Sequence, residues 1–349
     1  MKREHFAAIS ANDPRASATG IEPGDSPDQD GVLVLPGQLR LHHGGELQDV
    51  RVGWRLSGPA GAPVAMALGG ISAGRNVCGN SAASRGWWAD VVGKGQALDS
   101  NRLRILSFDY LGGSGNTVSG DEAPMPSIST YDQAQLALAL LNHLGLRALH
   151  AFVGASYGGM VGLAFAERYP DRLSRLICIS AADRSDPLAT GWRAVQRHIV
   201  RLGERTGEAR AALEIARALA MTTYRSREEF SARFGRQPTL QDGRHVFPVE
   251  EYLLSRGGQY ASLHRPDAFI CLSESIDLHA VDATRIFTPT TLVAVREDQL
   301  VPVADMRAMA ARLPHAQLSE ISSVFGHDAF LKEVAQLRAV FAKALGELP

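Results

Sequence analysis

The chain has 349 residues, of which 36 are Lys or Arg and 37 are Asp or Glu, so its formal net charge is −1. This length allows one large domain or two smaller ones, and it is ample for a buried core. The balanced charge argues against binding of nucleic acid or of an anionic membrane by bulk electrostatics. No apolar run approaches the roughly 20 residues of a membrane-spanning helix. We therefore expect a globular protein with no nucleic-acid and no membrane partner.

The three cysteines, Cys78, Cys178 and Cys271, lie far apart in the sequence. Their spacing does not suit a disulfide framework, and a zinc site normally needs closely spaced pairs, so we expect no metal site. The charged N-terminus is not followed by the apolar stretch of a signal peptide. These features indicate a reduced, cytoplasmic setting.

The N-terminal part of the chain changes character near residue 31. Residues 1–30 end in a stretch rich in Pro, Gly, Asp and Ser, which is typical of a disordered tail. Residues 32–41 and 47–56 are then expected to form two short strands. The intervening segment, H-H-G-G at 42–45, predicts a turn that joins them into an antiparallel hairpin.

Short apolar runs then alternate with helical patterns. The runs, which we expect to be strands, cover residues 63–68, 103–108, 149–153, 176–180, 290–295 and 316–321. The helical patterns cover residues 131–144, 158–169, 304–313 and 328–345. Such alternation is typical of a mostly parallel sheet with helices on both faces. Continuous apolar strands fit burial of both faces of that sheet.

Residues 183–282 interrupt the alternation. This stretch of about 100 residues is rich in Arg and mainly helical in pattern, and it lies between two expected strands. We therefore predict a helical cap over the carboxyl edge of the sheet. The expected organisation is a tail (1–30), an α/β core made of residues 31–182 and 283–349, and the cap (183–282).

A G-x-S-x-G pattern, G-A-S-Y-G at residues 154–158, lies between an expected strand and an expected helix. In that context the pattern indicates a nucleophile elbow, a sharp turn that projects the oxygen of Ser156 above the sheet. The N–H of Tyr157 would then help to bind the oxyanion that forms during attack on a carbonyl group. The alternative is a structural turn in which Ser156 only caps the helix.

A serine nucleophile in this architecture is followed along the chain by an acid and then by a histidine. Asp298 follows the strand expected at 290–295 and is the preferred acid, with the neighbouring Glu297 as the competing carboxylate. His327 follows the last expected strand and would be the general base. The alternatives are a helix-capping or loop carboxylate and a solvated histidine.

A second oxyanion donor is expected after the strand at 63–68, where the sequence continues with L-G-G-I at 68–71. Glycines allow backbone N–H groups to approach a ligand closely. We predict Leu68 or Gly69 as the donor. An ordinary glycine turn is the alternative.

Over most of residues 37–345 the sequence resembles the homoserine O-acyltransferases of the α/β-hydrolase superfamily, the family that includes homoserine O-acetyltransferases. The segments that carry the resemblance are G-W-W at 86–88, V-G-K-G-Q-A-L-D at 92–99, Y-L-G-G-S-G-N-T at 110–117, G-G-M at 158–160, T-T-Y-R-S at 222–226, V-E-E-Y-L at 249–253, S-I-D-L-H at 275–279 and G-H-D-A-F-L at 326–331. Their order and spacing together are fairly specific.

The resemblance implies an α/β-hydrolase fold and a ping-pong reaction of methionine biosynthesis, with acyl-CoA as co-substrate and no bound cofactor. Ser156 would accept the acyl group from the thioester, and the hydroxyl of L-homoserine would then take it, with His327 as base. The resemblance also implies that Arg225 pairs with the carboxylate of the amino acid and that Asp328 holds its α-ammonium group. It further implies a homodimer formed through the cap. Without the resemblance, we would interpret Arg225 as a solvated helix-end arginine and Asp328 as a helix cap.

Three positions depart from the family pattern. Tyr157 stands where the family usually has Met, residues 68–72 read L-G-G-I-S instead of the usual A-L-T-G, and the loop at 112–117 is shortened. These positions surround the expected acyl pocket. They leave open acetyl-CoA or succinyl-CoA as donor, and homoserine or serine as acceptor. A serine esterase with the same triad and a binding protein that kept only the fold are the other hypotheses.

Overall fold

The computed structural model describes residues 28–79, 85–120 and 125–346. Most of the expected tail, residues 1–27, lies outside the described residues. Gln29 and Asp30, which the sequence analysis placed in the tail, instead belong to strand β1, because their backbone pairs with Leu56 and Arg55. Regular structure within the described residues therefore begins slightly before the predicted boundary.

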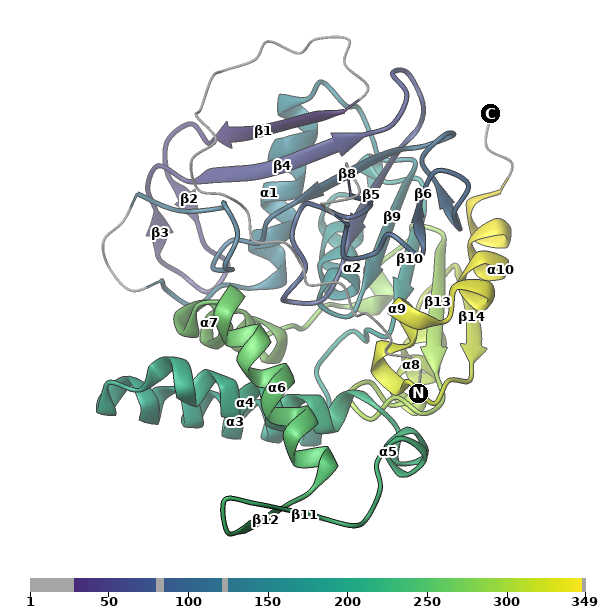
Figure 1. The fold of residues 1–349 in the computed structure, drawn as a ribbon. Coiled ribbons are helices and arrows are strands. Elements are labelled where there is room, and N and C mark those ends of the chain that lie inside the picture. The colour runs from purple at the N-terminus through teal and green to yellow at the C-terminus, as the bar shows by residue number, and fades with distance from the viewer. Residues whose placement is uncertain (1–27, 80–84, 121–124, 347–349) are drawn as a thin grey trace.

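An eight-stranded sheet forms the centre of the protein (Figure 1), with the strand order β1-β4-β8-β5-β9-β10-β13-β14. Strands β1 and β4 run antiparallel to each other, β4 is antiparallel to β8, and the remaining pairs are parallel. The strands are β1 Gln29–Val34, β4 Arg51–Ser57, β5 Val64–Leu68, β8 Arg104–Phe108, β9 Ala151–Ala155, β10 Leu176–Ile179, β13 Thr290–Val295 and β14 Ala316–Ile321.

The predicted N-terminal hairpin is more divided than the sequence suggested. Strand β1 ends at Val34, and Pro36, which has no N–H to donate, is followed by Gly37 at a φ of 74°. Two-residue strands, β2 Leu39–Arg40 and β3 Glu46–Leu47, form a separate antiparallel pair. Strand β1 therefore reaches its partner β4 across this small hairpin instead of across one tight turn.

Helices cover both faces of the sheet, as the apolar strands predicted. In β9, Ala151 and Val153 pack into the hydrophobic cluster that contains helix α10, whereas Phe152 between them packs into the cluster that contains helices α1 and α2. Successive side chains of a strand point to opposite faces, so both faces must be apolar. The core helices are α1 Thr130–His143, α2 Tyr157–Arg168, α8 Val303–Ala310, α9 Ala329–Lys332 and α10 Val334–Leu345.

The last predicted helix, 328–345, is divided into α9 and α10. Glu333 separates them at a φ of −88° and a ψ of 57°, outside the helical region. Its carboxylate accepts hydrogen bonds from the Ser323 hydroxyl at 2.7 Å and from the Gln336 amide at 2.8 Å. The break ties the end of the chain to the loop after β14.

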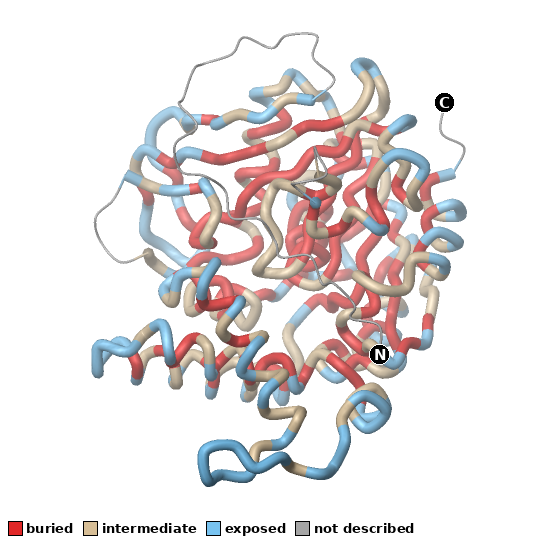
Figure 2. The backbone as a smooth tube through the Cα atoms, viewed as in Figure 1, coloured by how far each residue is buried: buried red, intermediate tan, exposed pale blue. Residues whose placement is uncertain are grey.

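Five helices between β10 and β13 form the cap, which lies together on one side of the core in Figure 1. They are α3 Pro187–Thr206, α4 Ala209–Tyr224, α5 Arg227–Arg233, α6 Pro248–Leu263 and α7 Pro266–Asp277. The cap has its own hydrophobic cluster, which includes Val200, Leu213 and Phe269. Between α5 and α6, the hairpin of β11 Thr239–Gln241 and β12 Arg244–Val246 is mostly exposed (Figure 2).

A further two-stranded sheet is the parallel pair of β6 Val92–Gly93 and β7 Leu98–Asp99, which precedes β8. Within the described ranges, no helix is both long and apolar enough to cross a membrane.

Candidate active site

Ser156 lies between the end of β9 and the start of α2, at a φ of 54° and a ψ of −124°. A positive φ is unfavourable for a residue with a side chain and persists only where the surroundings enforce it. The Ser156 N–H donates to the carbonyl of Ile179 at 2.8 Å, and its own carbonyl accepts from Gly159 and Met160 at 2.9 and 3.1 Å. These bonds hold the strained turn between β10 and the first turn of α2.

The two glycines of the motif are required by close backbone contacts. A Cβ at Gly154 would lie 2.2 Å from the carbonyl oxygen of Gly158, and a Cβ at Gly158 would lie 2.3 Å from that of Leu68. Neither contact is physically possible, and backbone atoms cannot move aside as a flexible side chain can. The sharp strand-to-helix turn therefore depends on the absence of both side chains.

The structure brings Ser156, His327 and Asp298 into one hydrogen-bonded line. The Ser156 Oγ lies 2.8 Å from His327 Nε2, and His327 Nδ1 lies 2.7 Å from Asp298 Oδ2. Because a carboxylate can only accept, Nδ1 carries the proton in the neutral ring and Nε2 accepts from the serine hydroxyl. This is the arrangement of a nucleophile, a general base and an orienting acid.

The three residues meet because they follow strands β9, β13 and β14, whose carboxyl ends share one edge of the sheet. Asp298 is fixed further by backbone N–H groups of Leu300 and Val301, which donate to its Oδ1 at 2.9 and 3.0 Å. The competing carboxylate, Glu297, accepts instead from the Ser323 N–H at 2.8 Å. The structure thus places Asp298, and not Glu297, beside the histidine.

The pKa of His327 is raised above its ordinary value. Burial alone would lower it, but the charge and the hydrogen bond of Asp298 outweigh burial, Asp328 adds to the rise, and Arg193 opposes it. The imidazolium form is therefore favoured relative to an isolated histidine. A histidine whose pKa is raised in this way accepts the serine proton readily. It is neutral, and therefore able to act as a base, only at higher pH.

The predicted oxyanion donors lie around the elbow. Tyr157 is the first residue of α2, so its N–H has no acceptor within the helix. Its buried side chain extends away to the cap, where its hydroxyl lies 2.7 Å from Ser275 Oγ in α7. The tyrosine that departs from the family pattern therefore links the elbow to the cap.

The loop after β5 is tied to the first turn of α2. The Gly69 carbonyl accepts from the Gly158 N–H at 2.8 Å and from the Tyr110 hydroxyl at 2.7 Å, while the Leu68 carbonyl packs against Gly158. The loop residues that line the adjacent cavity are Gly70, Ile71, Ser72 and Ala73. Leu68 and Gly69 lie next to the elbow but not on this lining, and their role as donors stays a prediction.

A cavity of about 170 Å³ opens above Ser156 and His327. The core contributes Trp87 and Phe330 to its wall, and the cap contributes side chains from α3, α4 and α7. The cap therefore closes a mainly apolar chamber over the nucleophile. Such a chamber excludes water from a reacting acyl group.

Arg225 and Asp328, predicted as substrate-binding residues, lie beside each other. Arg225 Nε is 3.3 Å from Asp328 Oδ2, and its Nη1 is 2.7 Å from Glu229 Oε1. The Arg225 side chain is only 6% exposed, so it is not a solvated arginine, and the Asp328 side chain makes no helix-capping hydrogen bond. Asp328 lines the catalytic cavity, whereas Arg225 lines a neighbouring cavity of about 620 Å³ beside the Asp298 loop.

Three arginines that the sequence did not single out, Arg184, Arg193 and Arg217, also line the catalytic cavity. The guanidinium of Arg217 lies 4.9 Å from the ring centre of Tyr224 and 4.5 Å from that of Tyr260. No carboxylate in the described part of the chain forms an ion pair with it. The available signal was the position of Arg217 among apolar residues in the second half of α4, where residues 215–221 read I-A-R-A-L-A-M.

The assembled groups suit nucleophilic acyl chemistry: an activated serine, a base, and a chamber under the cap whose wall carries both arginine and aspartate side chains. Within the described ranges, no cluster of three or more His, Cys, Asp or Glu side chains is arranged to hold a metal ion.

Comparison with known proteins shows where this chain has relatives. The family model of the α/β hydrolase fold matches residues 77–334. A homoserine O-succinyltransferase of Xanthomonas campestris pv. campestris is 43% identical, over 90% of this chain and 83% of that protein. A homoserine O-acetyltransferase of Thermobifida fusca is 31% identical over 96% and 98%, and a serine O-succinyltransferase of Litchfieldella anticariensis is 29% identical over 91% and 99%.

Solved structures share the fold at lower identity. A homoserine O-acetyltransferase from Bacillus anthracis superposes with a TM-score of 0.84 at 17% identity, covering 93% of this chain and 99% of the other. Esterase E22 superposes with a TM-score of 0.83 at 18% identity, covering 91% and 100%. The likeness to both a transferase and an esterase establishes the fold. It does not distinguish an amino acid from water as the acceptor of the acyl group.

We predict that an alkyl fluorophosphonate labels Ser156 and that the labelling rate rises with pH. The midpoint of this rise should lie above 6.5, the ordinary pKa of histidine, because the raised pKa of His327 keeps the base protonated at lower pH. Asp298→Asn should slow labelling at least roughly 100-fold and shift the midpoint to lower pH. Mass spectrometry of the labelled peptide measures both.

Ser180 provides the control, since it also lines the cavity at a positive φ of 48° but has no hydrogen-bond partner for its hydroxyl among the described residues. Ser180→Ala should label at an undiminished rate, and Ser156→Ala should not label. Persistent labelling of Ser156→Ala would contradict the assignment of the nucleophile.

Proposed function

Because this chain belongs to the α/β-hydrolase fold family and, within it, to the homoserine O-acyltransferases, we propose that it transfers an acyl group from acyl-CoA to the hydroxyl of L-homoserine. The observation that carries the proposal is the line of Ser156, His327 and Asp298 at the base of a cavity closed by the cap. In this family the reaction serves methionine biosynthesis. The co-substrate is acyl-CoA, and the chemistry requires no further cofactor.

The first half-reaction loads Ser156. Its Oγ attacks the thioester carbonyl while His327 Nε2 takes the hydroxyl proton, and the N–H groups of Tyr157 and of Leu68 or Gly69 bind the oxyanion. The C–S bond then breaks. The departing CoA thiolate takes the proton from His327, and the acyl group remains as an ester on Ser156.

The second half-reaction repeats these steps with a new nucleophile. His327 removes the proton from the homoserine hydroxyl, whose oxygen attacks the acyl-enzyme carbonyl. The ester bond to Ser156 breaks, Ser156 Oγ recovers the proton from His327, and O-acylhomoserine leaves. In both halves Asp298 stabilises the transient imidazolium.

Transfer competes with hydrolysis of the acyl-enzyme, so the acceptor must be bound and water excluded. A serine esterase remains the second candidate function, because esterase E22 shares the fold at a TM-score of 0.83. The enclosed cavity and its charged groups favour an amino-acid acceptor over water. Serine is the alternative acceptor, since one relative is a serine O-succinyltransferase.

For the acceptor, we propose that Asp328 binds the α-ammonium group and that Arg225 binds the carboxylate. Asp328 contacts Arg225 Nε and Glu229 contacts its Nη1, whereas Nη2 makes no hydrogen bond to a described residue and is the donor left for the substrate carboxylate.

Arg217 is a second candidate for the carboxylate, because it lines the cavity. Burial opposes its charge, but Tyr224, Tyr260 and then Asp328 outweigh burial and raise its pKa. Either arginine would place the zwitterion beside His327.

We also propose a homodimer formed through the cap. Leu188, Val195 and Leu202, each seven residues apart on α3, are 60%, 53% and 55% exposed. Seven residues correspond to about two turns, so the three side chains share one helix face. Such a stripe on a cap helix is suited to packing against a second copy.

The compartment is a proposal as well. Cys78, Cys178 and Cys271 are free thiols, and acyl-CoA is an intracellular metabolite. Both support function in the reducing cytoplasm.

The direct test incubates the enzyme with acetyl-CoA or succinyl-CoA, with and without L-homoserine, and follows CoA release. We expect homoserine to accelerate release and O-acylhomoserine to form, with Ser156→Ala at least roughly 1,000-fold slower. Release that homoserine leaves unchanged would favour the esterase.

The arginine that binds the acceptor carboxylate can be identified with 3-aminopropan-1-ol, which is homoserine without its carboxylate. The wild-type enzyme should prefer homoserine. Replacing the responsible arginine with Met should reduce this preference roughly 10- to 100-fold, the value of a charged hydrogen bond. Arg225→Met and Arg217→Met are compared by their ratios of kcat/KM for the two acceptors, and an unchanged ratio excludes that arginine.

The dimer is tested with Val195→Glu, which places a charge within the apolar stripe of α3 without disturbing a buried side chain. We expect light scattering to show a dimer for the wild-type protein and a monomer for the variant. A wild-type monomer at working concentration would refute the proposed assembly.

A further inference from the structure

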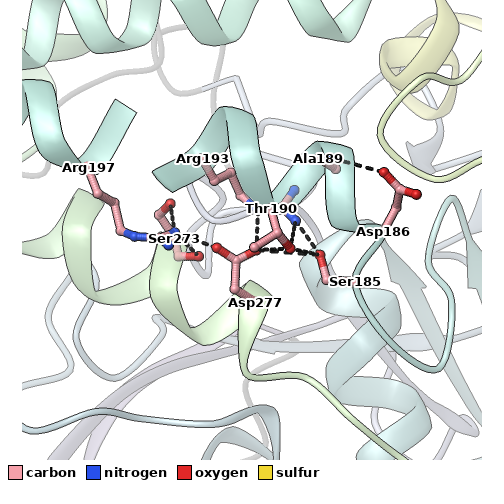
Figure 3. A network of polar contacts seen from close by, with 8 residues as sticks. All are labelled: Ser185, Asp186, Ala189, Thr190, Arg193, Arg197, Ser273 and Asp277. Atoms are coloured by element: carbon pink, nitrogen blue, oxygen red, sulfur yellow. Dashed lines mark hydrogen bonds and ion pairs between the residues drawn. The ribbon is translucent and has the colours of Figure 1, made fainter. Parts of the chain in front are cut away.

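Glu297 lies directly before Asp298 in the loop after β13, and it forms no ion pair with a described residue. The carboxylate of Asp277 in the cap shows the usual arrangement, since it accepts hydrogen bonds from two arginines of α3 (Figure 3). The arginine next to Glu297, Arg296, is paired with Glu320 at 3.4 Å instead. An acid beside the catalytic acid that is satisfied without a cation calls for a different explanation.

The carboxylate of Glu297 holds the loop that follows β14. Its Oε2 accepts a hydrogen bond from the backbone N–H of Ser323 at 2.8 Å, and its Oε1 accepts one from the Ser322 hydroxyl. Burial favours the protonated acid, but these two hydrogen bonds outweigh burial and lower the pKa of Glu297. Glu297 is therefore an anionic bridge between the loop that carries Asp298 and the loop that leads to His327.

Ser323 transmits this attachment toward His327. Its hydroxyl oxygen accepts from the Phe325 N–H at 3.1 Å, and its carbonyl accepts from the Gly326 N–H at 3.0 Å. The same hydroxyl donates to the carboxylate at the break between α9 and α10 at 2.7 Å. The short turn that leads into His327 is thus fixed at its first residue, which is only 4% exposed.

The cap is attached to the same two loops at other points. Gln299, in the loop after β13, donates to the carbonyl of Arg225 at 3.2 Å, and the Ser226 N–H donates to the carbonyl of Val324 at 3.2 Å. Arg225 and Ser226 form the junction of α4 and α5. The cap therefore contacts each loop separately, whereas Glu297 joins the two loops directly.

The catalytic line depends on the separation of these two loops. Within the line itself, they are joined only by the 2.7 Å hydrogen bond between the His327 and Asp298 side chains. His327 must at the same time stay within reach of Ser156, which comes from a third strand. A displacement of about 1 Å in a catalytic group can slow a reaction about 100-fold, so a second link between the loops has catalytic value.

We propose that Glu297 is a positioning residue: by holding Ser323, it keeps His327 within hydrogen-bond distance of both Asp298 and Ser156. This inference rests on the proposed acyl chemistry of Ser156, and it applies whichever donor or acceptor is used. The partners of Glu297 are atoms of the loop and not the histidine ring, so it acts through the loop.

The test compares the wild-type protein with Glu297→Ala, Glu297→Gln and Glu320→Ala. Glu297→Ala removes the bridge, and Glu297→Gln keeps one of its two acceptor oxygens. Glu320→Ala is the matched control, since it removes an acid from the end of β14 whose partners are the side chains of Arg296 and Arg307. Thermal unfolding shows whether each variant is folded.

Two readouts report the geometry of the catalytic line. The first is the rate of fluorophosphonate labelling of Ser156 as a function of pH, which gives a plateau rate and a midpoint. The second is the low-field proton NMR signal of the hydrogen bond between His327 and Asp298, assigned by its loss in Asp298→Asn. A residue needed only for loop stability would move neither the midpoint nor this signal.

We expect Glu297→Ala to lower the plateau rate roughly 10- to 100-fold. The midpoint should move to lower pH and the NMR signal to higher field, because a histidine held less closely to Asp298 loses part of the rise in its pKa. Glu297→Gln should show a smaller effect of the same kind. Glu320→Ala should match the wild-type protein in both readouts.

A folded Glu297→Ala protein with the wild-type plateau rate overturns the proposal, as does a slower one with the wild-type midpoint and NMR signal. If Glu297→Ala does not fold, Glu297→Gln supplies the same comparison. Labelling requires neither acyl-CoA nor homoserine, so these results decide the role of Glu297 even if the proposed donor or acceptor is wrong. A wild-type protein that is not labelled at Ser156 would overturn both proposals.

Discussion

The active site depends on the close approach of three backbone segments around Ser156. The end of β9, the first turn of α2 and the end of β5 meet so tightly that Gly154 and Gly158 have no room for a Cβ. This packing forces Ser156 into its positive φ and places its Oγ within hydrogen-bond distance of His327. The free energy of the surrounding core supports this strain, since β9 and α2 are almost entirely buried.

The parallel order of the sheet supplies the other members of the triad. Asp298 and His327 are distant from Ser156 in the sequence, but the strands that precede them end at the same edge of the sheet. The loops at that edge also carry the cap, so the helices that close the cavity lie over the nucleophile. One topological feature therefore assembles the catalytic groups and the chamber around them.

The balanced net charge means that the whole protein supplies no field to attract anionic substrates. Positive charge is instead placed locally, on cap arginines held by specific partners. Arg193 is fixed by Asp277 and Ser185, Arg217 by two aromatic rings, and Arg225 by two carboxylates. These partners differ in charge, so the three arginines differ in how much positive charge they leave for a ligand.

Several features follow from local sequence pattern alone. The G-x-S-x-G motif at 154–158 indicated the elbow, since the sharp strand-to-helix turn has no room for a side chain at either glycine. The apolar runs marked the central strands, since both faces of a parallel sheet are buried. The order of Ser156, Asp298 and His327 along the chain, with the strand before each one, was also readable. The charge balance and the resemblance to the acyltransferases also lie in the sequence itself.

Other features required the tertiary structure, because they depend on contacts between distant segments. Glu297 and Asp298 are adjacent and chemically alike, and only the path of the loop after β13 turns Asp298 toward His327. Gln29 and Asp30 look like part of a polar tail and become a strand only because β4 offers an edge. The position of Arg193 and Arg217 on the cavity wall could not be predicted from the sequence for the same reason. In sequence they are two of many cap arginines, and only the packing of α3 and α4 over Ser156 shows that they line the cavity, with different partners for their charge.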